Sequence, residues 1–480
     1  MRFFIYFLFL SLTSIASEKP NIIMISIDDL NTWVGYAGGH PQAITPNIDK
    51  LADRGVAFLD AHCTSPLCNP SRSSLLSGLR EEKTGIFNNS QKFNLRKFEL
   101  LPKYFEKNGY STYGTGKLHH QHNNKIFCQE AFNPQQRWSP FQNPKLVLYS
   151  KEEQDSKGSA NPRHVITNGP GGKDYILPFN RMPSDRAPKR NSGESFDWHA
   201  FDLEDKDFGE GMVTEWAIEK LKNHDKDKPF FMGLGYYRPH IPLYAPKKYF
   251  DLYPLDKIQL PKVMENDLDD LPEIGRKWAL EAVTAGLHSS TVKHNQWKNA
   301  VQAYLACVSF VDAQIGKVLE YVDNSPYANN TIIVLFSDHG WHLGEKQHWG
   351  KWTGWDISTR VPFIIVPAGA AKNPNCKQPV SLLDIYPTLI EMAGLPQKEL
   401  DGVSIAGLIK NPAQETGRTV RTLFDKGNFT LANSKWRYIR YKDGSEELYN
   451  RVQDPDEFHN LAEKEEYREV IEMMRKSEFK

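Results

Sequence analysis

The residues from Cys68 to Arg72 have the side chains needed to bind or attack an anion. They read Cys-Asn-Pro-Ser-Arg and precede a segment, 73–78, that is compatible with a helix. Because proline is tolerated in a first helical turn, the run predicts a helix that begins near Cys68. The N–H groups at such an N-terminus favour an anion, and Arg72 could add a bidentate contact. Taken alone, a buried structural cysteine before an ordinary helix explains these residues equally well.

Two pairs of potential metal ligands follow apolar runs rich in β-branched residues. The runs, 21–27 and 331–336, are typical of strands buried on both faces of a parallel sheet. The pairs that follow them are Asp28 with Asp29, and Asp338 with His339. Crevices form beyond the carboxyl ends of parallel strands, so these side chains can converge there. Three carboxylates favour Ca²⁺ or Mg²⁺ over a soft metal, although an isolated Asp-Asp pair is more often a turn or a helix cap.

Together these motifs resemble the type I sulfatases of the alkaline phosphatase superfamily, and most closely the iduronate-2-sulfatase-like branch. The Cys-x-Pro-Ser-Arg run matches the sulfatase signature, and the likeness extends over nearly the whole chain after residue 17. The resemblance implies that a maturation enzyme oxidises Cys68 to Cα-formylglycine, which replaces the thiol by a hydrated aldehyde. It also implies one Ca²⁺ ion with a defined ligand set. The set is Asp28, Asp29, Asp338, His339 and the modified Cys68.

The same resemblance gives roles to residues in three further segments. Lys117 and Lys351 would contact the sulfate. Either His119 or His120 would hold the hydrated aldehyde and later remove its proton, and the iduronate-type spacing favours His120. His240 would protonate the leaving alcohol, whereas its neighbour Arg238 receives no role. Without the other motifs, these residues would be interpreted as a basic turn, a loop histidine and a surface lysine.

Hydrolysis of a sulfate ester is the activity that the resemblance implies. The substrate would be a sulfated carbohydrate, with a 2-O-sulfated uronic acid as one candidate. Ca²⁺, Arg72, Lys117 and Lys351 would hold the sulfate. One hydroxyl of the hydrated formylglycine would attack sulfur, and the other would expel sulfate. Two alternatives stay open: a phosphodiesterase or phosphonate monoester hydrolase of the same superfamily, and a non-catalytic sulfoglycan-binding protein with unmodified Cys68.

The elements that must position these residues alternate between strands and helices. Further strands are predicted at 229–235 and 361–366, and helices at 45–55, 299–321 and 382–393. This pattern predicts an α/β fold in which helices sandwich a large, mostly parallel sheet, as in alkaline phosphatase. The catalytic domain would span 18–395.

Two regions depart from this alternation. Residues 121–200 are polar and rich in Pro, Gly and Asn, which predicts long surface loops. After residue 395 the pattern changes to alternating strands around the Asp443-Gly444 turn signal, followed by a polar helix at 463–476. We therefore expect a C-terminal α+β subdomain over 396–480, with a small antiparallel sheet and a helix.

Composition sets the remaining bounds. The 480 residues include 59 basic and 59 acidic side chains and are 40% hydrophobic, which excludes a disordered chain and argues against general nucleic-acid binding. Residues 1–17 combine a positive start, a short apolar core and small residues, which predicts a signal peptide and export to the periplasm or beyond. That apolar run is too short to predict stable membrane insertion. The five cysteines are too sparse to define the fold.

Overall fold

The computed structural model describes residues 19–142, 144–148, 164–185, 194–282, 284–369 and 374–477. The predicted signal peptide, 1–17, lies outside this part of the chain. None of the helices in the described ranges is both long enough and apolar enough to cross a membrane.

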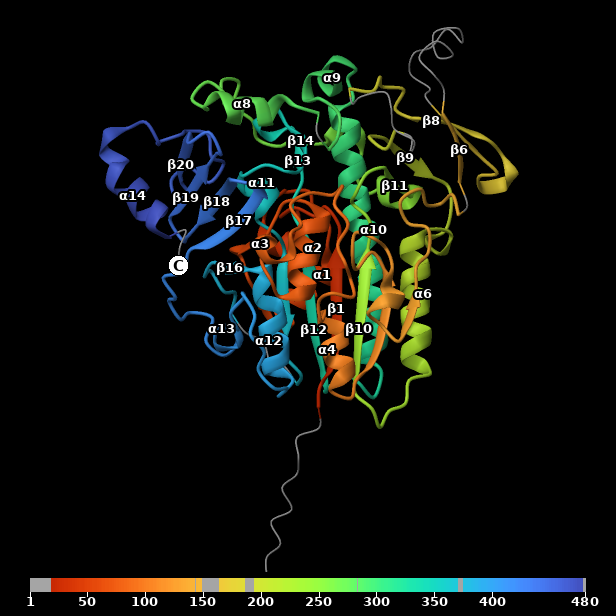
Figure 1. The fold of residues 1–480 in the computed structure, drawn as a ribbon. Coiled ribbons are helices and arrows are strands. Elements are labelled where there is room, and N and C mark those ends of the chain that lie inside the picture. The colour runs from red at the N-terminus through yellow and green to blue at the C-terminus, as the bar shows by residue number, and fades with distance from the viewer. Residues whose placement is uncertain are drawn as a thin grey trace, which may run out of the picture.

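A seven-stranded sheet forms the centre of the molecule (Figure 1). Its strands in spatial order are β2 (Val56–Ala57), β15 (Phe363–Val366), β12 (Thr331–Ser337), β1 (Asn21–Ile27), β10 (Phe230–Tyr236), β4 (Ser111–Gly116) and β5 (Glu130–Phe132). The strands from β12 to β5 are parallel, whereas β15 runs antiparallel to its neighbours β12 and β2. The prediction of a mostly parallel sheet is confirmed.

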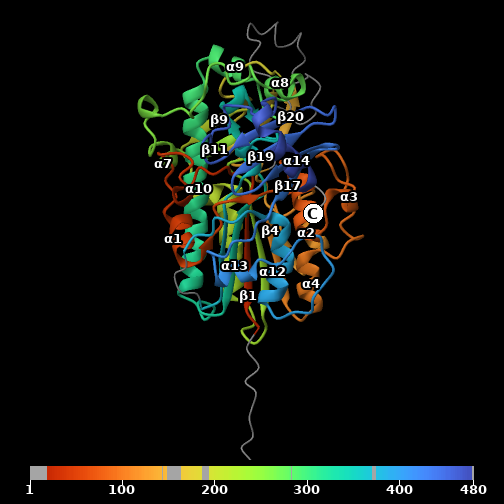
Figure 2. The same cartoon turned by 90° about the vertical axis from the view of Figure 1, so that its left-hand side faces the viewer.

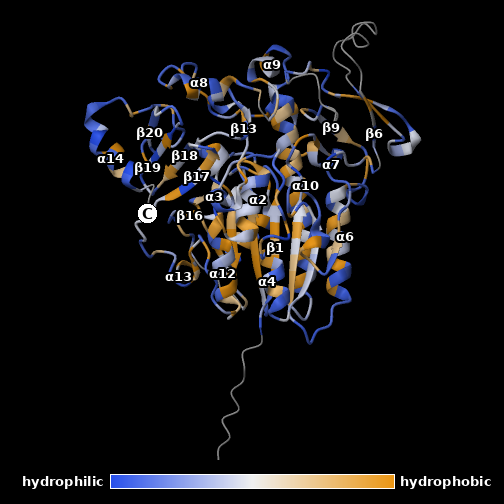
Figure 3. Cartoon of the chain, viewed as in Figure 1, coloured by the Kyte–Doolittle hydropathy of each residue, from blue (hydrophilic) through white to orange (hydrophobic). Residues whose placement is uncertain are grey.

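Helices cover both faces of this sheet (Figure 2). One face carries α1 (Pro46–Arg54), α6 (Gly209–Lys222) and α10 (Trp297–Asp323), and the other carries α2 (Cys68–Ser77), α4 (Leu101–Lys107) and α12 (Ile385–Met392). Alternate residues of β1 enter the two cores: Ile23 and Ile25 pack on the α10 side, and Ile22 and Met24 on the α2 side. The central strands are accordingly apolar along their length (Figure 3).

A four-stranded antiparallel sheet lies beside the central sheet, as predicted for the C-terminal region (Figure 1). It consists of β17 (Val420–Asp425), β18 (Asn428–Ala432), β19 (Trp436–Arg440) and β20 (Glu446–Asn450), and α14 (Arg468–Ser477) packs on it. Arg437 of β19 is fully buried and forms ion pairs with Asp356 and Glu457. Because Asp356 precedes β15 of the central sheet, this charge cluster ties the two sheets together.

Residues 121–200 differ from the predicted loops. Besides β5, the described part of this region contains the small sheet of β6 (Lys145–Leu148), β7 (His164–Thr167) and β8 (Tyr175–Leu177). It also contains β9 (Trp198–Phe201), which pairs with β11 (Leu243–Pro246). Strands of three or four residues are too short to produce a recognisable alternation in the sequence, so the prediction of loops alone is wrong here.

Glu81 gives the fold a pH-dependent stability. It lies in α3 (Glu81–Thr84) and is 2% exposed, and no described residue forms a hydrogen bond with its Oε1. Burial raises its pKa from 4.5 to about 7. The folded state therefore binds the proton more tightly, and its stability falls as the pH rises from 4.5 to 7. We expect Glu81→Gln to stabilise the protein by about 3 kcal/mol at pH 8 and to have little effect at pH 4.5.

Denaturant midpoints of the Glu81→Gln variant and the unsubstituted protein at the two pH values measure this difference. The exposed neighbour Glu82, which pairs with Arg421, provides the control through Glu82→Gln. An equal gain for Glu81→Gln at both pH values would contradict the expectation.

Candidate active site

The carboxyl ends of β1 and β12 bring the predicted metal ligands together. The two strands are parallel neighbours, and Ile27 pairs with Ser337, so the residues that follow each strand lie side by side. Asp28, Asp29, Asp338 and His339 are all fully buried. One ligand atom from each of Asp28, Cys68, Asp338 and His339 lies within 4.8 Å of the others, and Asp28, Asp29, Cys68 and His240 form a second such group.

Cys68 lies at the centre of this arrangement. It is the first residue of α2, as predicted, and is 1% exposed. Its Sγ lies 3.0 Å from Lys351 Nζ, 3.5 Å from Lys117 Nζ and 3.3 Å from His339 Nε2. Burial alone would raise the pKa of the thiol, but the charges of Lys117, Lys351 and His339 hold it well below its usual value. The site thus stabilises negative charge at this position.

The three carboxylates are in unequal environments. Burial opposes ionisation of Asp28, but the charges of Lys117, His240 and Arg72 hold its pKa below the usual value. For Asp29 burial prevails over the charge of Lys351 and raises the pKa to about 8. The Oδ2 atom of Asp29 is buried and has no hydrogen-bond partner among the residues that the structure describes. A cation beside Asp29 would satisfy this oxygen and favour its ionised form, so the donor set fits a metal ion that prefers oxygen ligands.

The guanidinium of Arg72 contacts the carboxylates of Asp338 and Asp28. Its Nε donates to Asp338 Oδ2 (2.7 Å), its NH2 lies 3.4 Å from Asp28 Oδ1, and its NH1 donates to Ser26 Oγ (2.9 Å). All three nitrogens are therefore used within the protein. In this position Arg72 orients two potential metal ligands, and its expected contact with the substrate anion stays a prediction.

The loop after β4 places Lys117 and separates the two candidate histidines. Gly116 has φ 66°, and a Cβ there would lie 2.0 Å from the oxygen of Gly235, so only glycine allows this approach to β10. Lys117 then forms an ion pair with Asp28. His119 is fully buried, and its Nε2 lies 3.0 Å from Ser73 Oγ in α2. His120 instead acts on Cys68 and helps to keep the pKa of that thiol low, and its own Nδ1 is buried without a hydrogen-bond partner among the described residues.

The loop after β10 places His240 beside Asp29. Its Nε2 lies 3.7 Å from Asp29 Oδ2, and its Nδ1 lies 2.7 Å from the carbonyl oxygen of Ile241. Burial lowers the pKa of His240 to about 3. Tyr237 packs against it with ring centroids 4.6 Å apart, and Lys117 Nζ lies 4.7 Å from the same tyrosine ring.

Two residues that the sequence did not single out support this site. Tyr304 of α10 donates to the carbonyl oxygen of Asp29 (2.8 Å) and accepts from the N–H of Asn31 (2.9 Å). Ser337 accepts from the N–H of Leu30 (3.0 Å) and donates to the carbonyl oxygen of His339 (2.8 Å). No local pattern marks Tyr304, which lies in the middle of a long helix 275 residues from Asp29.

Comparison with known proteins gives matches along almost the whole chain. The sequence profile described as "Sulfatase" matches residues 20–395, and that of the N-sulphoglucosamine sulphohydrolase C-terminal family matches residues 344–479. A sulfatase of Formosa agariphila is 35% identical over 470 residues, which cover 95% of this chain and 86% of that protein. Iduronate 2-sulfatase of Mus musculus is 30% identical over 422 residues, which cover 79% and 70%.

A solved structure, phosphonate monoester hydrolase of Agrobacterium radiobacter, superposes with a TM-score of 0.73 at 19% identity. The alignment covers 96% of this chain and 95% of the hydrolase. At this identity the likeness concerns the fold.

Proposed function

The chain belongs to the sulfatase family and is a sulfuric ester hydrolase, and we propose that its substrate is a sulfated carbohydrate bound at the cluster around Cys68. One observation carries the proposal: Cys68 lies at a helix N-terminus, between two buried lysines and among potential metal ligands. A sulfate ester bears delocalised negative charge on its terminal oxygens. The site offers positive charge at the place where that group must bind to be attacked.

We assign one Ca²⁺ ion to Asp28, Asp29, Asp338, His339 and the modified Cys68. The orphaned Asp29 Oδ2 and the predominance of carboxylate oxygens support this choice. When bound, the ion supplies positive charge that offsets the carboxylates and polarises a sulfate oxygen. A maturation enzyme would convert Cys68 to formylglycine, whose hydrate supplies the nucleophilic oxygen.

The remaining residues bind sulfate and move protons. Lys117 and Lys351 hold the sulfate oxygens. His240 donates a proton to the leaving alcohol from Nε2, because Nδ1 is engaged with a backbone carbonyl. Burial disfavours the charged imidazole, and an anionic substrate beside it favours that form. His120 accepts a proton at the Cys68 position. Arg72 keeps Asp338 and Asp28 in place.

Within the sulfated carbohydrates, we propose a 2-O-sulfated uronic acid, because the relatives include an iduronate 2-sulfatase. We further propose that the protein is exported, as the predicted signal peptide at 1–17 indicates.

Parallel kinetics on matched esters test the proposed chemistry. Protein made in a host that forms formylglycine would be assayed, with Ca²⁺, on an aryl sulfate, the corresponding aryl phosphate and an aryl phosphonate. We expect kcat/KM to be highest for the sulfate. A faster reaction with the phosphate or the phosphonate would replace the proposal by the phosphoester alternative. Tight binding of sulfated glycan without turnover, in fully modified protein, would favour the binding-protein alternative.

The structure also predicts different effects for the two neighbouring histidines. Since His120 favours the ionised form of Cys68, His120→Ala is expected to lower kcat about 100-fold or more, as for loss of an acid–base group. His119 contacts Ser73 inside the protein, so His119→Ala should mainly reduce the thermal midpoint. Steady-state rates of the folded variants, with melting curves, compare the two. A larger kcat loss for His119→Ala would reverse the assignment.

A further inference from the structure

The guanidinium of Arg137 has no partner of opposite charge in the described part of the chain. Among the described residues, none forms an ion pair with it or accepts a hydrogen bond from it, and its Nε is buried without an acceptor. Its terminal carbon lies 5.3 Å from the ring of Trp138, and the residue as a whole is half-buried. Removing part of a charged group from water without an acceptor is unfavourable. An unpaired guanidinium in this state is therefore suited to an anion that arrives from outside.

The residue before Arg137, Gln136, is anchored to the same backbone oxygen as Lys117. The carbonyl oxygen of Gly235, near the end of β10, accepts from the N–H of Lys117 (3.0 Å) and from Nε2 of Gln136 (3.0 Å). Arg137 is the next residue after Gln136 in the chain. The backbone at 136–137 is consequently held near Lys117, which contacts Cys68.

Arg238, which the sequence left without a role, holds this segment. It is fully buried, and its NH2 donates to the carbonyl oxygens of Arg137 and Ser139, both at 3.2 Å. Its Nε donates to the carbonyl oxygen of Tyr244 (3.1 Å). Arg238 thus joins the backbone of Arg137 to the loop that carries His240. This support fixes the base of the Arg137 side chain in advance of binding.

Tyr237 connects Arg137 to the reacting centre. Its ring lies 4.7 Å from Lys117 Nζ and packs on His240. Burial raises the pKa of Tyr237, and the charges of Lys117 and Arg137 both oppose that shift, so both cations act on one phenol. Both positive groups are therefore near enough to affect the Tyr237 phenol, and one of them, Lys117, also contacts Cys68.

We propose that Arg137 binds a second anionic group of the substrate, a carboxylate or another sulfate on the sugar that carries the scissile sulfate. The inference rests on the proposed function and refines it, because it makes a sugar with two anionic groups the preferred substrate. The planar fork of Arg137 offers two parallel N–H donors, which match either oxyanion. Lys117 and Lys351 would hold the scissile sulfate, while Arg137 selects for the second charge.

Three related substrates and three variants test this selection. The substrates are an aryl sulfate, an aryl glycoside of a 2-O-sulfated uronic acid, and the same glycoside with its carboxylate reduced to an alcohol. The variants are Arg137→Gln, Arg137→Lys and Lys125→Gln. Lys125 is an exposed lysine whose neighbour Asn124 binds the carbonyl oxygen of Gly116, so it controls for loss of a nearby charge.

We expect Arg137→Gln to lower kcat/KM for the sulfated uronide about 30-fold or more, chiefly through KM. Rates on the aryl sulfate and on the reduced glycoside should change less than about threefold, and Arg137→Lys should recover part of the loss. Lys125→Gln should affect all three substrates alike. If a disulfated sugar without a carboxylate shows the selective loss and the uronide does not, the second anion is a sulfate. An equal loss on every substrate, or none, would overturn the inference. Turnover of the aryl sulfate by the unsubstituted protein tests the proposed function independently.

Discussion

Replacement of Cys68 by alanine is expected to abolish turnover of sulfate esters, with a fall in kcat of at least about 10⁴-fold, as when other enzymes lose their nucleophile. Cys68 occupies the N-terminus of α2. Side-chain nitrogens of Lys117, Lys351 and His339 lie within 3.5 Å of its sulfur. Alanine leaves these charges in place but removes the atom that must become the attacking group. Cys68→Ser should be similarly inactive if the formylglycine hydrate is required. Initial rates on an aryl sulfate, with melting curves for the variants, provide the measurement.

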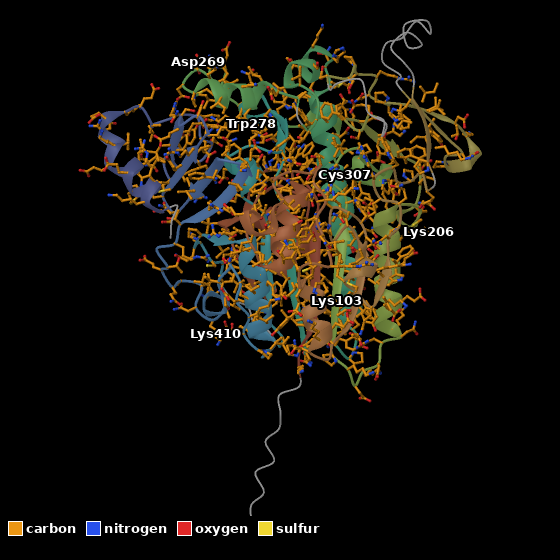
Figure 4. The ribbon with its side chains drawn as sticks, in the orientation of Figure 1. Lys103, Lys206, Asp269, Trp278, Cys307 and Lys410 are labelled. Atoms are coloured by element: carbon orange, nitrogen blue, oxygen red, sulfur yellow. The ribbon has the colours of Figure 1, made fainter. Side chains whose placement is uncertain are left out.

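Cys307 provides the matched control for this result. It is also fully buried, in α10, and it is labelled in Figure 4. Cys307→Ala should retain turnover within about threefold, since Cys307 has no contact with the cluster and the change leaves only a small cavity. Retention of normal turnover by Cys68→Ala would rule out Cys68 as the source of the nucleophile.

The mass of the tryptic peptide 55–72 tests the chemical state of Cys68. Oxidation to the aldehyde removes sulfur and two hydrogens and adds oxygen. A peptide that contains only intact cysteine, in protein that turns over sulfate esters, would exclude the formylglycine proposal.

Replacement of Lys351 by methionine should produce the second large effect, a fall in kcat/KM of about 10²–10³-fold. The Lys351 ammonium forms an ion pair with Asp29 and lies 3.0 Å from Cys68 Sγ. Its loss removes positive charge from the sulfate position. It also leaves Asp29, whose pKa burial already raises to about 8, without the charge that opposes this rise. We therefore expect the variant to need more Ca²⁺ as well, which titration of activity with Ca²⁺ would measure.

Lys346 is the appropriate comparison, because it is a buried lysine five residues before Lys351 whose ion pair lies outside the cluster around Cys68. It is 3% exposed and pairs with Asp267 rather than with the cluster. Lys346→Met should lower the thermal midpoint, since it leaves a buried carboxylate unpaired, while the folded fraction keeps its kcat. If Lys351→Met behaved like Lys346→Met, with stability lost and kcat/KM retained, the assigned sulfate contact would be wrong.

Some features of this protein follow from local sequence. Residues 21–27 and 331–336 are continuous apolar runs rich in β-branched residues, which is typical of central strands in a parallel sheet with helices on both faces. The acidic residues that end these runs must therefore emerge at one edge. The N-terminus of α2 at Cys68 and the hairpin of β19 and β20 were likewise predictable, because proline and the Asp-Gly turn act within a few residues.

Other features depended on the tertiary structure. The contact of Arg72 with Asp338 joins residues 266 positions apart, and that of Tyr304 with Asp29 spans 275. Neither leaves a local pattern. The different environments of His119 and His120 depend on how the loop after β4 packs against α2. Whether Arg137 has an acidic partner depends on which distant residues pack around it. Strand periodicity and turn chemistry are encoded by neighbouring residues, whereas the partner of a buried charge is decided only when distant segments pack and exclude water.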